Sequence, residues 1–216
     1  MPSHRYPIIA KEGWPLIAIL LFLCVIFYYT LPYLIIPTVL ILAFLIFLLR
    51  DPYRLIPSDP LGIVCPVHGI VTLVDKYQSE RLGKEVSRIR IKMSWLDIYS
   101  LRSPIEGKII EQWATRKNCK EDKRHDFLIH TDEGDEVLTK IRYRNKYCSK
   151  IPLMSGQRIG QGKRCGFLCL GAEVDVSVAG NISLEVAVGD RVDSGCTVLA
   201  HLIHHAEVTV VKNKEQ

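Results

Sequence analysis

The sequence lacks charged residues over a long stretch near its N-terminus: the 37 consecutive residues from Gly13 to Leu49 include no charged side chain. An apolar run longer than about 18 residues is typical of a membrane span. A secretory signal peptide is the alternative, but its apolar core is only about 7–15 residues long and is followed by a small-residue cleavage site. The length of this run therefore favours membrane insertion.

The run is too long for one simple span. A single helix of this length would measure about 55 Å, against a hydrocarbon core of about 30 Å. Pro32 and Pro37 lie near its middle, where a helix would be interrupted. We therefore expect a transmembrane or re-entrant hairpin with helices at residues 14–31 and 34–49.

The flanks of the run predict its orientation. Arg5 and Lys11 precede it, and Arg50 and Arg54 follow it. Basic flanks prefer the cytoplasmic side of a membrane. The expected organisation is a cytoplasmic N-terminus at residues 1–12, a membrane hairpin at 13–49 and one domain at 50–216 on the cytoplasmic side of the cell (inner) membrane, with the bilayer as a partner.

The chain also lacks a basic stripe interleaved with aromatic residues, although its formal net charge is +5. Such a stripe is what a nucleic-acid surface needs, so no nucleic-acid partner is expected. A positive balance at a tethered domain suits attraction to anionic lipid headgroups. The alternative is an ordinary surface of mixed charge.

The seven cysteines show no framework spacing. Cys165 and Cys169 are four residues apart, but neither a second pair nor a nearby histidine completes a zinc set. His201, His204 and His205 are expected to be surface residues. We therefore expect reduced cysteines and no metal.

Beyond Pro57 the chain has little helical pattern and many short β-prone runs separated by Gly, Pro, Asn and Asp. Only Trp95–Leu101 reads as a short helix, with Ser94 as its N-cap. The expected fold is mainly β: a helical hairpin followed by one sandwich-like or barrel-like domain. The expected strands are 63–64, 70–74, 86–92, 108–113, 127–130, 136–142, 165–170, 174–178, 183–188 and 197–202.

Two segments repeat one pattern. CPVHGIV (Cys65–Val71) and SPIEGKI (Ser103–Ile109) both read small-Pro-x-x-Gly-x-hydrophobic. Proline ends a strand and glycine permits a tight turn. Two facing hairpins are therefore expected.

Several motifs in order resemble those of short-form phosphatidylserine decarboxylases. LLRDPYRLIP (Leu48–Pro57) after the apolar run resembles the family's "FFRDPxRxxP", and CPVHG resembles "SPADG". KMSWLDIYSLRSPIEGKI (Lys92–Ile109) resembles "FMSPxDVHVNRSPxxGxV", although the family's Asn is Leu101 here. GQRIGQGKRCGFLCLGAEVDVSV (Gly156–Val178) and VAVGDRVDSGCTVLA (Val186–Ala200) resemble the family's last two motifs.

The resemblance implies a proenzyme of phospholipid metabolism. In the family, a serine after a glycine cuts the chain and becomes a pyruvoyl group. That group is the electron sink that converts phosphatidylserine to phosphatidylethanolamine and CO₂. An aspartate in "SPADG" and a histidine in "DVHVNR" assist the serine, as in a Ser-His-Asp triad.

This chain departs from the family at all three positions. The serine position after Gly171 is Ala172, which has no nucleophilic oxygen. The histidine position is Tyr99, a poor general base at neutral pH, and the aspartate position is His68. Ser177 and Ser183 lie downstream, but neither follows a glycine. The Gly171–Ala172 junction is therefore expected to stay uncut, with no functional catalytic residues and no pyruvoyl cofactor.

Three functional hypotheses remain open. The first is a membrane-anchored pseudoenzyme that binds phosphatidylserine or phosphatidylethanolamine, with Arg102, Arg142 and Arg144 as candidate phosphate ligands. It would act by lipid sensing or by regulating an active paralogue, as a mixed or homo-oligomer. The second is an active phosphatidylserine decarboxylase that uses an unrecognised route. The third is a non-enzymatic adaptor or a biotinyl- or lipoyl-like carrier modified at Lys76.

Overall fold

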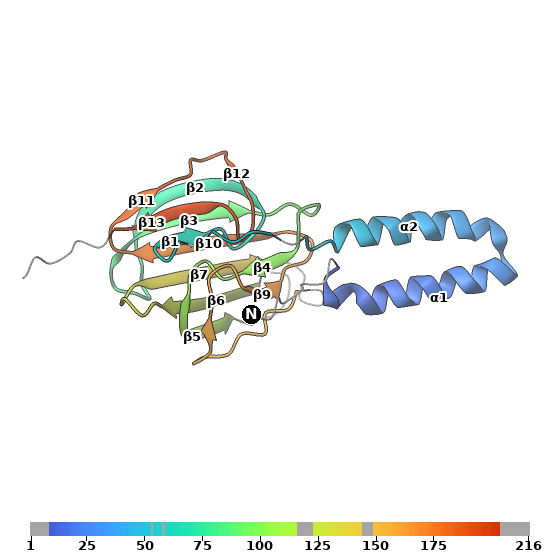
Figure 1. The fold of residues 1–216 in the computed structure, drawn as a ribbon, viewed down its shortest axis with the longest axis horizontal. Coiled ribbons are helices and arrows are strands. Elements are labelled where there is room, and N and C mark those ends of the chain that lie inside the picture. The colour runs from blue at the N-terminus through green and yellow to red at the C-terminus, as the bar shows by residue number, and fades with distance from the viewer. Residues whose placement is uncertain (1–8, 53, 58, 116–122, 144–148, 204–216) are drawn as a thin grey trace, which may run out of the picture.

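The protein consists of a helical hairpin followed by a β domain (Figure 1). The computed structural model describes residues 9–52, 54–57, 59–115, 123–143 and 149–203. The expectation of a mainly β fold is confirmed, and the sheet curls into a half-barrel. The strands are β1 Gly62–Val64, β2 Gly69–Gln78, β3 Glu85–Lys92, β4 Ser100–Arg102, β5 Gly107–Thr115, β6 Lys123–His130, β7 Glu136–Tyr143, β8 Arg158–Ile159, β9 Arg164–Phe167, β10 Ala172–Ala179, β11 Ile182–Leu184, β12 Arg191–Val192 and β13 Val198–Leu202.

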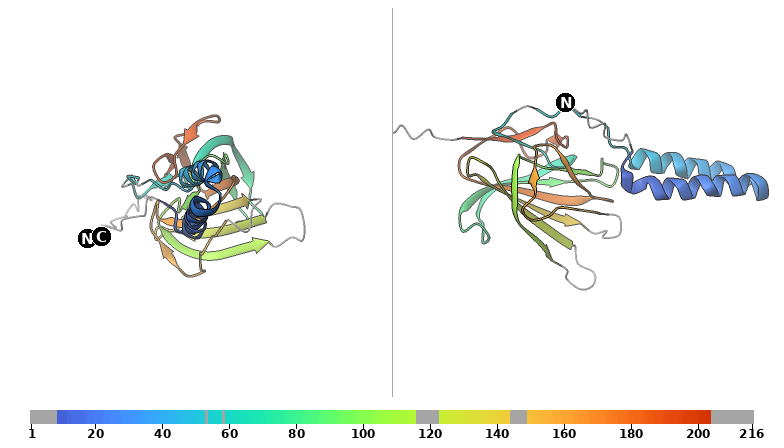
Figure 2. Two further views of the ribbon diagram at one scale, coloured as in Figure 1. Left: turned by 90° about the vertical axis from the view of Figure 1, so that its right-hand side faces the viewer. Right: turned by 60° about the horizontal axis from the view of Figure 1, so that its bottom comes forward.

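The hairpin has the predicted break. A short 3₁₀ helix, η1 (Lys11–Gly13), leads into α1 (Trp14–Thr30), and η2 (Pro32–Leu34) separates α1 from α2 (Ile35–Leu48). The two α-helices lie side by side and project away from the β domain (Figure 2). At 1.5 Å per residue they are about 26 Å and 21 Å long. In the described part of the chain, the helical segment Lys11–Thr30 is the one long and apolar enough to cross a membrane.

The base of the hairpin is fixed to the β domain. The Ala10 amide donates to the Leu49 carbonyl at 2.9 Å, which joins the chain entering the hairpin to the chain leaving it. Arg164 on β9 pairs with Glu12 at 2.7 Å. The hairpin therefore starts and ends at one edge of the domain, at the same end as the C-termini of β3 and β7 and the start of β10 (Figure 1).

The main sheet has eight antiparallel strands in the order β12-β2-β3-β10-β7-β6-β5-β8. The central strand β10 alternates strictly: Val174, Val176 and Val178 are buried in the apolar core, and Asp175 and Ser177 face the other side. A three-stranded sheet, β1-β13-β11, and a two-stranded sheet, β4-β9, complete the domain. The core lies against the valine face of β10.

Each repeated segment leads into a hairpin, as predicted, and the two hairpins lie in one sheet with β10 and β7 between them. Gly69 begins β2, which pairs with β3, and Gly107 begins β5, which pairs with β6. A Cβ atom at either glycine would lie 2.4 Å from a carbonyl oxygen, that of Lys92 or that of His130. The repeated glycine is therefore needed for the close approach of two strands.

The repetition extends to the whole sheet, which consists of two four-stranded halves, β12-β2-β3-β10 and β8-β5-β6-β7. The two repeated segments also bond to each other. The Val64 amide donates to the Pro104 carbonyl at 2.8 Å, and the Arg102 amide donates to the Pro66 carbonyl at 2.9 Å. The halves are thus related by an approximate two-fold arrangement centred on β10 and β7.

One predicted element is wrong. The segment expected as a helix forms a turn at residues 93–99 and then the strand β4. Ser94 does not cap a helix; its amide donates to the Asp97 carboxylate at 2.6 Å, while the Asp97 amide donates to the Ser94 carbonyl at 3.3 Å. Hydrogen bonds of this local kind favour turns over helices. The short strands β8 and β12 were not predicted, and β11 ends earlier than expected.

Candidate functional site

The Gly171–Ala172 junction is a strained turn at the start of β10. Leu170 and Gly171 both have left-handed backbone angles, with φ of 62° and 89°. Among the described residues Leu170 is the one non-glycine with positive φ, a conformation that costs free energy for a branched side chain. Ala172 is buried, and its carbonyl accepts a hydrogen bond from the Met93 amide at 2.9 Å.

Tyr99 lies beside this junction. Its hydroxyl donates to the Trp95 carbonyl, and its ring packs edge-on against Phe167 with centroids 5.6 Å apart. Burial raises the pKa of Tyr99, and a hydrogen bond with the Leu170 backbone offsets this only in part. The side chain is therefore a neutral phenol at pH 7, held against the backbone of Leu170, which lies two residues before Ala172.

His68 lies between two carboxylates. Its Nδ1 is 2.6 Å from Asp193 Oδ1, and its Nε2 is 3.5 Å from Asp97 Oδ1. Burial raises the pKa of Asp193, but the Arg54 guanidinium at 3.1 Å and His68 itself outweigh burial and lower it. His68 therefore links the turn at residues 93–99 to the loop after β12.

The turn at residues 93–99 brings the three predicted positions together. Tyr99 ends the turn, and His68 contacts its Asp97. A Cβ atom at Gly171 would lie 3.2 Å from the Met93 carbonyl oxygen, so the junction packs against the start of the same turn. Sequence motifs separated by more than a hundred residues thus form one site.

A pocket of about 270 Å³ opens at the junction. Its polar groups are Lys92 and Arg142, which are cationic, and Glu173, which is acidic. Arg142 pairs with Glu173 at 3.0 Å and with Asp175 at 3.3 Å, and it is only partly buried. The remaining lining is Met93, Leu170, Gly171 and Ala172. The pocket offers charged donors at its rim and a small apolar floor.

Of the other two arginines predicted to contact phosphate, Arg102 is a structural residue. Its side chain is 2% exposed, and it contacts the Gly162 carbonyl at 3.1 Å and Asp51 at 3.5 Å. Asp51, directly after the hairpin, also lies 3.4 Å from Arg164. Arg102 therefore holds the base of the hairpin and does not face a headgroup. Arg144 lies outside the described residues.

The cysteines agree only in part with the sequence predictions. Cys24, Cys65, Cys165 and Cys196 are free thiols, as expected, whereas Cys169 is disulfide-bonded, which contradicts the expectation of reduced cysteines throughout. In the described part of the chain no cluster of His, Cys, Asp and Glu could hold a metal. His201 is partly exposed and pairs with Asp59 at 2.9 Å; His204 and His205 lie outside the described residues.

The geometry argues against Ser177 as a replacement nucleophile and against Lys76 as the modified lysine of a carrier domain. Ser177 is fully buried on β10, where its hydroxyl lies 3.3 Å from the Tyr77 hydroxyl, away from the junction. Lys76 lies within the paired part of β2, opposite Ser87, not at the tip of a hairpin as a carrier lysine must be. Asp51 and Asp97 were missed as site residues; the "RDP" and "WLD" segments in which they lie were the available signal.

Comparison with known proteins gives consistent matches. Residues 41–200 match the family model described as phosphatidylserine decarboxylase. A phosphatidylserine decarboxylase proenzyme of Nitrosomonas europaea is 31% identical over 211 residues, which cover 92% of this chain and 97% of the relative. One of Burkholderia cenocepacia is 30% identical over 217 residues, 93% of this chain and 99% of the relative. No solved structure is significantly similar.

Proposed function

Because the chain belongs to the phosphatidylserine decarboxylase family and has alanine at its junction, we propose that it is a membrane-anchored member that stays uncut and forms no pyruvoyl group. It binds a phospholipid headgroup without decarboxylating it. The observation that carries this proposal is Ala172 itself, since a methyl group offers no oxygen to attack the Gly171 carbonyl.

The surroundings of the junction support the same conclusion. Tyr99 is a neutral phenol that donates a hydrogen bond to a backbone carbonyl, so it is a poor base. His68 is engaged with Asp97 and Asp193. The residues present do not fit the pyruvoyl group, because that group is made from a serine that this chain lacks.

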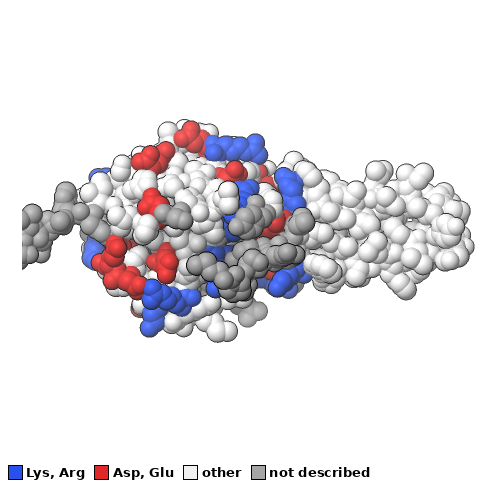
Figure 3. Space-filling model, viewed as in Figure 1, with Lys and Arg blue, Asp and Glu red and all other residues white. Residues whose placement is uncertain are grey.

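Headgroup binding is supported by the junction pocket. Lys92 and Arg142 supply donors for a phosphate, and Glu173 supplies an acceptor for an ammonium group. The pocket lies at the end of the domain that faces the helical hairpin, where Lys and Arg side chains gather in the view of Figure 3. A protein that holds a headgroup without converting it would sense the lipid or present it to an active relative.

The proposed orientation places this end of the domain on the bilayer. α1 and α2 carry no charged residue and expose apolar side chains on all sides, as expected for lipid contact. Around the pocket, Trp95 is 54% exposed, Leu170 49% and Leu96 40%. Exposed apolar side chains with a tryptophan among them are typical of the interface of a membrane. The basic flanks Arg50 and Arg54 favour the cytoplasmic face.

The intact mass of the purified full-length protein tests the uncut junction. We expect one species at the 24.6 kDa of the whole chain. A variant that combines His68→Asp, Tyr99→His and Ala172→Ser restores the family residues and serves as the positive control for detecting cleavage. Two fragments from the parent chain, the second beginning with a keto acid at position 172, would overturn the proposal and indicate an active decarboxylase.

Lipid retention tests headgroup binding. The protein is released from nanodiscs containing equal amounts of phosphatidylserine, phosphatidylethanolamine and phosphatidylcholine, and its bound lipids are measured by native mass spectrometry. We expect enrichment of the first two lipids over phosphatidylcholine, and loss of that enrichment in Lys92→Gln combined with Arg142→Gln. Lys108→Gln combined with Lys150→Gln, at two exposed lysines outside the pocket, is the charge-matched control. Equal retention of all three lipids by the parent protein would refute headgroup recognition.

A further inference from the structure

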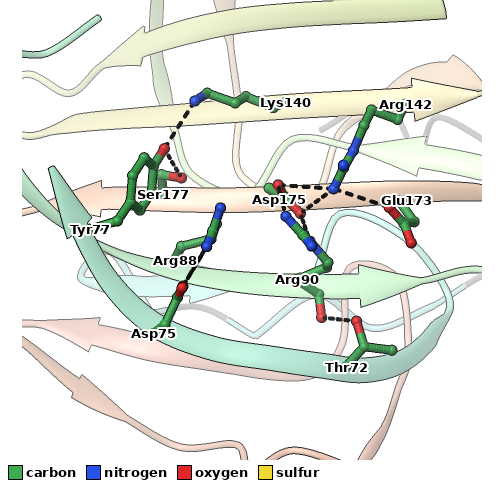
Figure 4. A network of polar contacts seen from close by, with 10 residues as sticks. All are labelled: Thr72, Asp75, Tyr77, Arg88, Arg90, Lys140, Arg142, Glu173, Asp175 and Ser177. Atoms are coloured by element: carbon green, nitrogen blue, oxygen red, sulfur yellow. Dashed lines mark hydrogen bonds and ion pairs between the residues drawn. The ribbon is translucent and has the colours of Figure 1, made fainter. Parts of the chain in front are cut away.

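A second cavity, of about 380 Å³, lies on the polar face of the main sheet, opposite the apolar core. Its lining is dominated by cationic side chains from β3, β6, β7 and the turn after β2. Figure 4 shows the polar network that crosses this face. The cationic lining residues are Arg81, Arg88, Arg90, Arg124, Lys140 and Arg142, and the acidic ones are Glu80, Asp126 and Asp175.

The turn between β2 and β3 contributes Glu80 and Arg81 to the lining of the cavity. Arg81 in this turn reaches β6, where it pairs with Asp126 at 3.3 Å, and its guanidinium lies 4.1 Å from the ring centre of Trp113 on β5. Tyr77 near the end of β2 contacts Ser177 on β10 at 3.3 Å. These contacts join β2 and the turn after it to β5, β6 and β10, and they hold the lining residues in place for a ligand.

The positive charges of the cavity are not all neutralised. Arg88 pairs with Asp75, with Nε 2.8 Å from Oδ1, and Arg90 pairs with Asp175 at 2.7 Å. Among the described residues, however, Lys140 forms no ion pair and donates to the Tyr77 hydroxyl at 3.0 Å.

Arg124 also forms no ion pair within the described part of the chain, and it stands directly opposite Arg142 in the β6–β7 register. Like charges opposite each other destabilise a sheet. The cavity therefore offers at least two cations whose charge an anion would balance.

One acceptor in the cavity is unused. Asp126 is 6% exposed, and its Oδ2 pairs with Arg81, but its buried Oδ1 has no hydrogen-bond partner among the described residues. Burial raises the pKa of Asp126, and Arg81, Lys140 and Arg124 offset this only in part. A buried carboxylate oxygen without a donor is costly, so a ligand that supplies one N–H or O–H group here gains free energy.

We propose that this cavity binds a small phosphate ester that also carries a hydrogen-bond donor, of which a phosphorylated amine is the simplest case. The phosphate oxygens contact Lys140 and Arg124, because charge-assisted hydrogen bonds are the strongest available here. The donor group meets Asp126 Oδ1. The site is separate from the junction pocket, apart from Arg142, which lines both.

Calorimetric titration of the full chain in phosphatidylcholine nanodiscs tests the site, with O-phosphoethanolamine as the probe. We expect saturable one-to-one binding that is roughly tenfold weaker in Lys140→Gln and in Arg124→Gln. Lys108→Gln, which removes a charge from outside the cavity, leaves the affinity unchanged. Asp126→Asn weakens O-phosphoethanolamine but not inorganic phosphate, because only the amine uses the carboxylate. A melting curve of each variant verifies that it is folded.

Two results of the titration would contradict the proposed site. Heat that does not saturate, or a Lys108→Gln variant that loses as much affinity as Lys140→Gln, would mean non-specific attraction and would overturn the proposal. Repeating the titration in phosphatidylethanolamine nanodiscs distinguishes the sources: unchanged affinity indicates a soluble ester, and competition indicates a lipid headgroup. The readout does not involve junction cleavage, so failure here is distinguishable from failure of the proposed function.

Discussion

Tyr99 forms structural contacts beside the Gly171–Ala172 junction. The family position calls for an imidazole, whereas the phenol found here donates to the Trp95 carbonyl and packs against Phe167. The sequence predicted the loss of a base at this position. It could not predict the new partners, because Trp95 lies in a turn that the Asp97–Ser94 hydrogen bond stabilises, and Phe167 lies on β9, far along the chain.

Asp126 provides a test at the residue scale that depends on pH. Because burial raises its folded-state pKa above the ordinary 3.8, its protonated form is the one that folding favours. Its contribution to stability is therefore largest at low pH and is lost as the pH rises through the raised value. We expect Asp126→Asn to raise the melting temperature at pH 7, and the difference to vanish below about pH 3.8.

The control for this prediction is Glu111→Gln on the exposed side of β5, which should leave the melting temperature nearly unchanged at both pH values. If Asp126→Asn lowers the melting temperature at pH 7, the pair with Arg81 outweighs burial, and the expected sign is wrong.

At the scale of elements, Gly69 and Gly107 allow a test of the close strand contact that the two repeated segments share. Gly69→Ala and Gly107→Ala each place a methyl group 2.4 Å from a backbone carbonyl oxygen. We expect each to lower the free energy of unfolding by about 1–3 kcal/mol, the usual cost of overpacking. Urea unfolding measures this. Gly160→Ala, which meets no atom within 4 Å, is the neutral control, and a large loss there would contradict the steric explanation.

Asp51 tests the connection between hairpin and domain. It is buried between Arg102 and Arg164, and removal of one partner from a buried ion pair leaves uncompensated charge. We expect Asp51→Asn to destabilise the domain by about 3 kcal/mol, at the lower end for such pairs. Glu136→Gln, which breaks the exposed pair with Lys84, should cost less than about 1 kcal/mol in the same assay. Equal effects would show that Asp51 has no special role.

The elements that the sequence predicted are those with local signals. The hairpin follows from the charge-free run and Pro32, and β10 follows from the alternation of Val174, Val176 and Val178. β8 and β12 are two residues long and exist only through pairing with β5 and β2, so no local pattern marks them. The cationic cavity was also missed, since its residues are spread over five strands and meet only after folding.

At the scale of the whole molecule, the proposed orientation predicts where Trp95 lies. The chain has three tryptophans, Trp14, Trp95 and Trp113, so single-tryptophan variants follow from pairs of Trp→Phe substitutions. In nanodiscs with brominated lipids we expect the fluorescence of Trp95 to be quenched by bromines near the headgroups. Trp113, which lies under Arg81 on the sheet, should not be quenched, and Trp14 is the positive control. Unquenched Trp95 would mean that the pocket does not face the bilayer.

A Leu170–Ala172 turn that stays uncut, as proposed, has a consequence for how the molecule is assembled. β10 is the central strand between β3 and β7, so severing the chain before it would leave the middle of the sheet on a separate piece. A continuous chain can lose its structure in urea and regain it alone, at a rate independent of dilution. Two pieces would first have to collide, and dilution would slow their reunion.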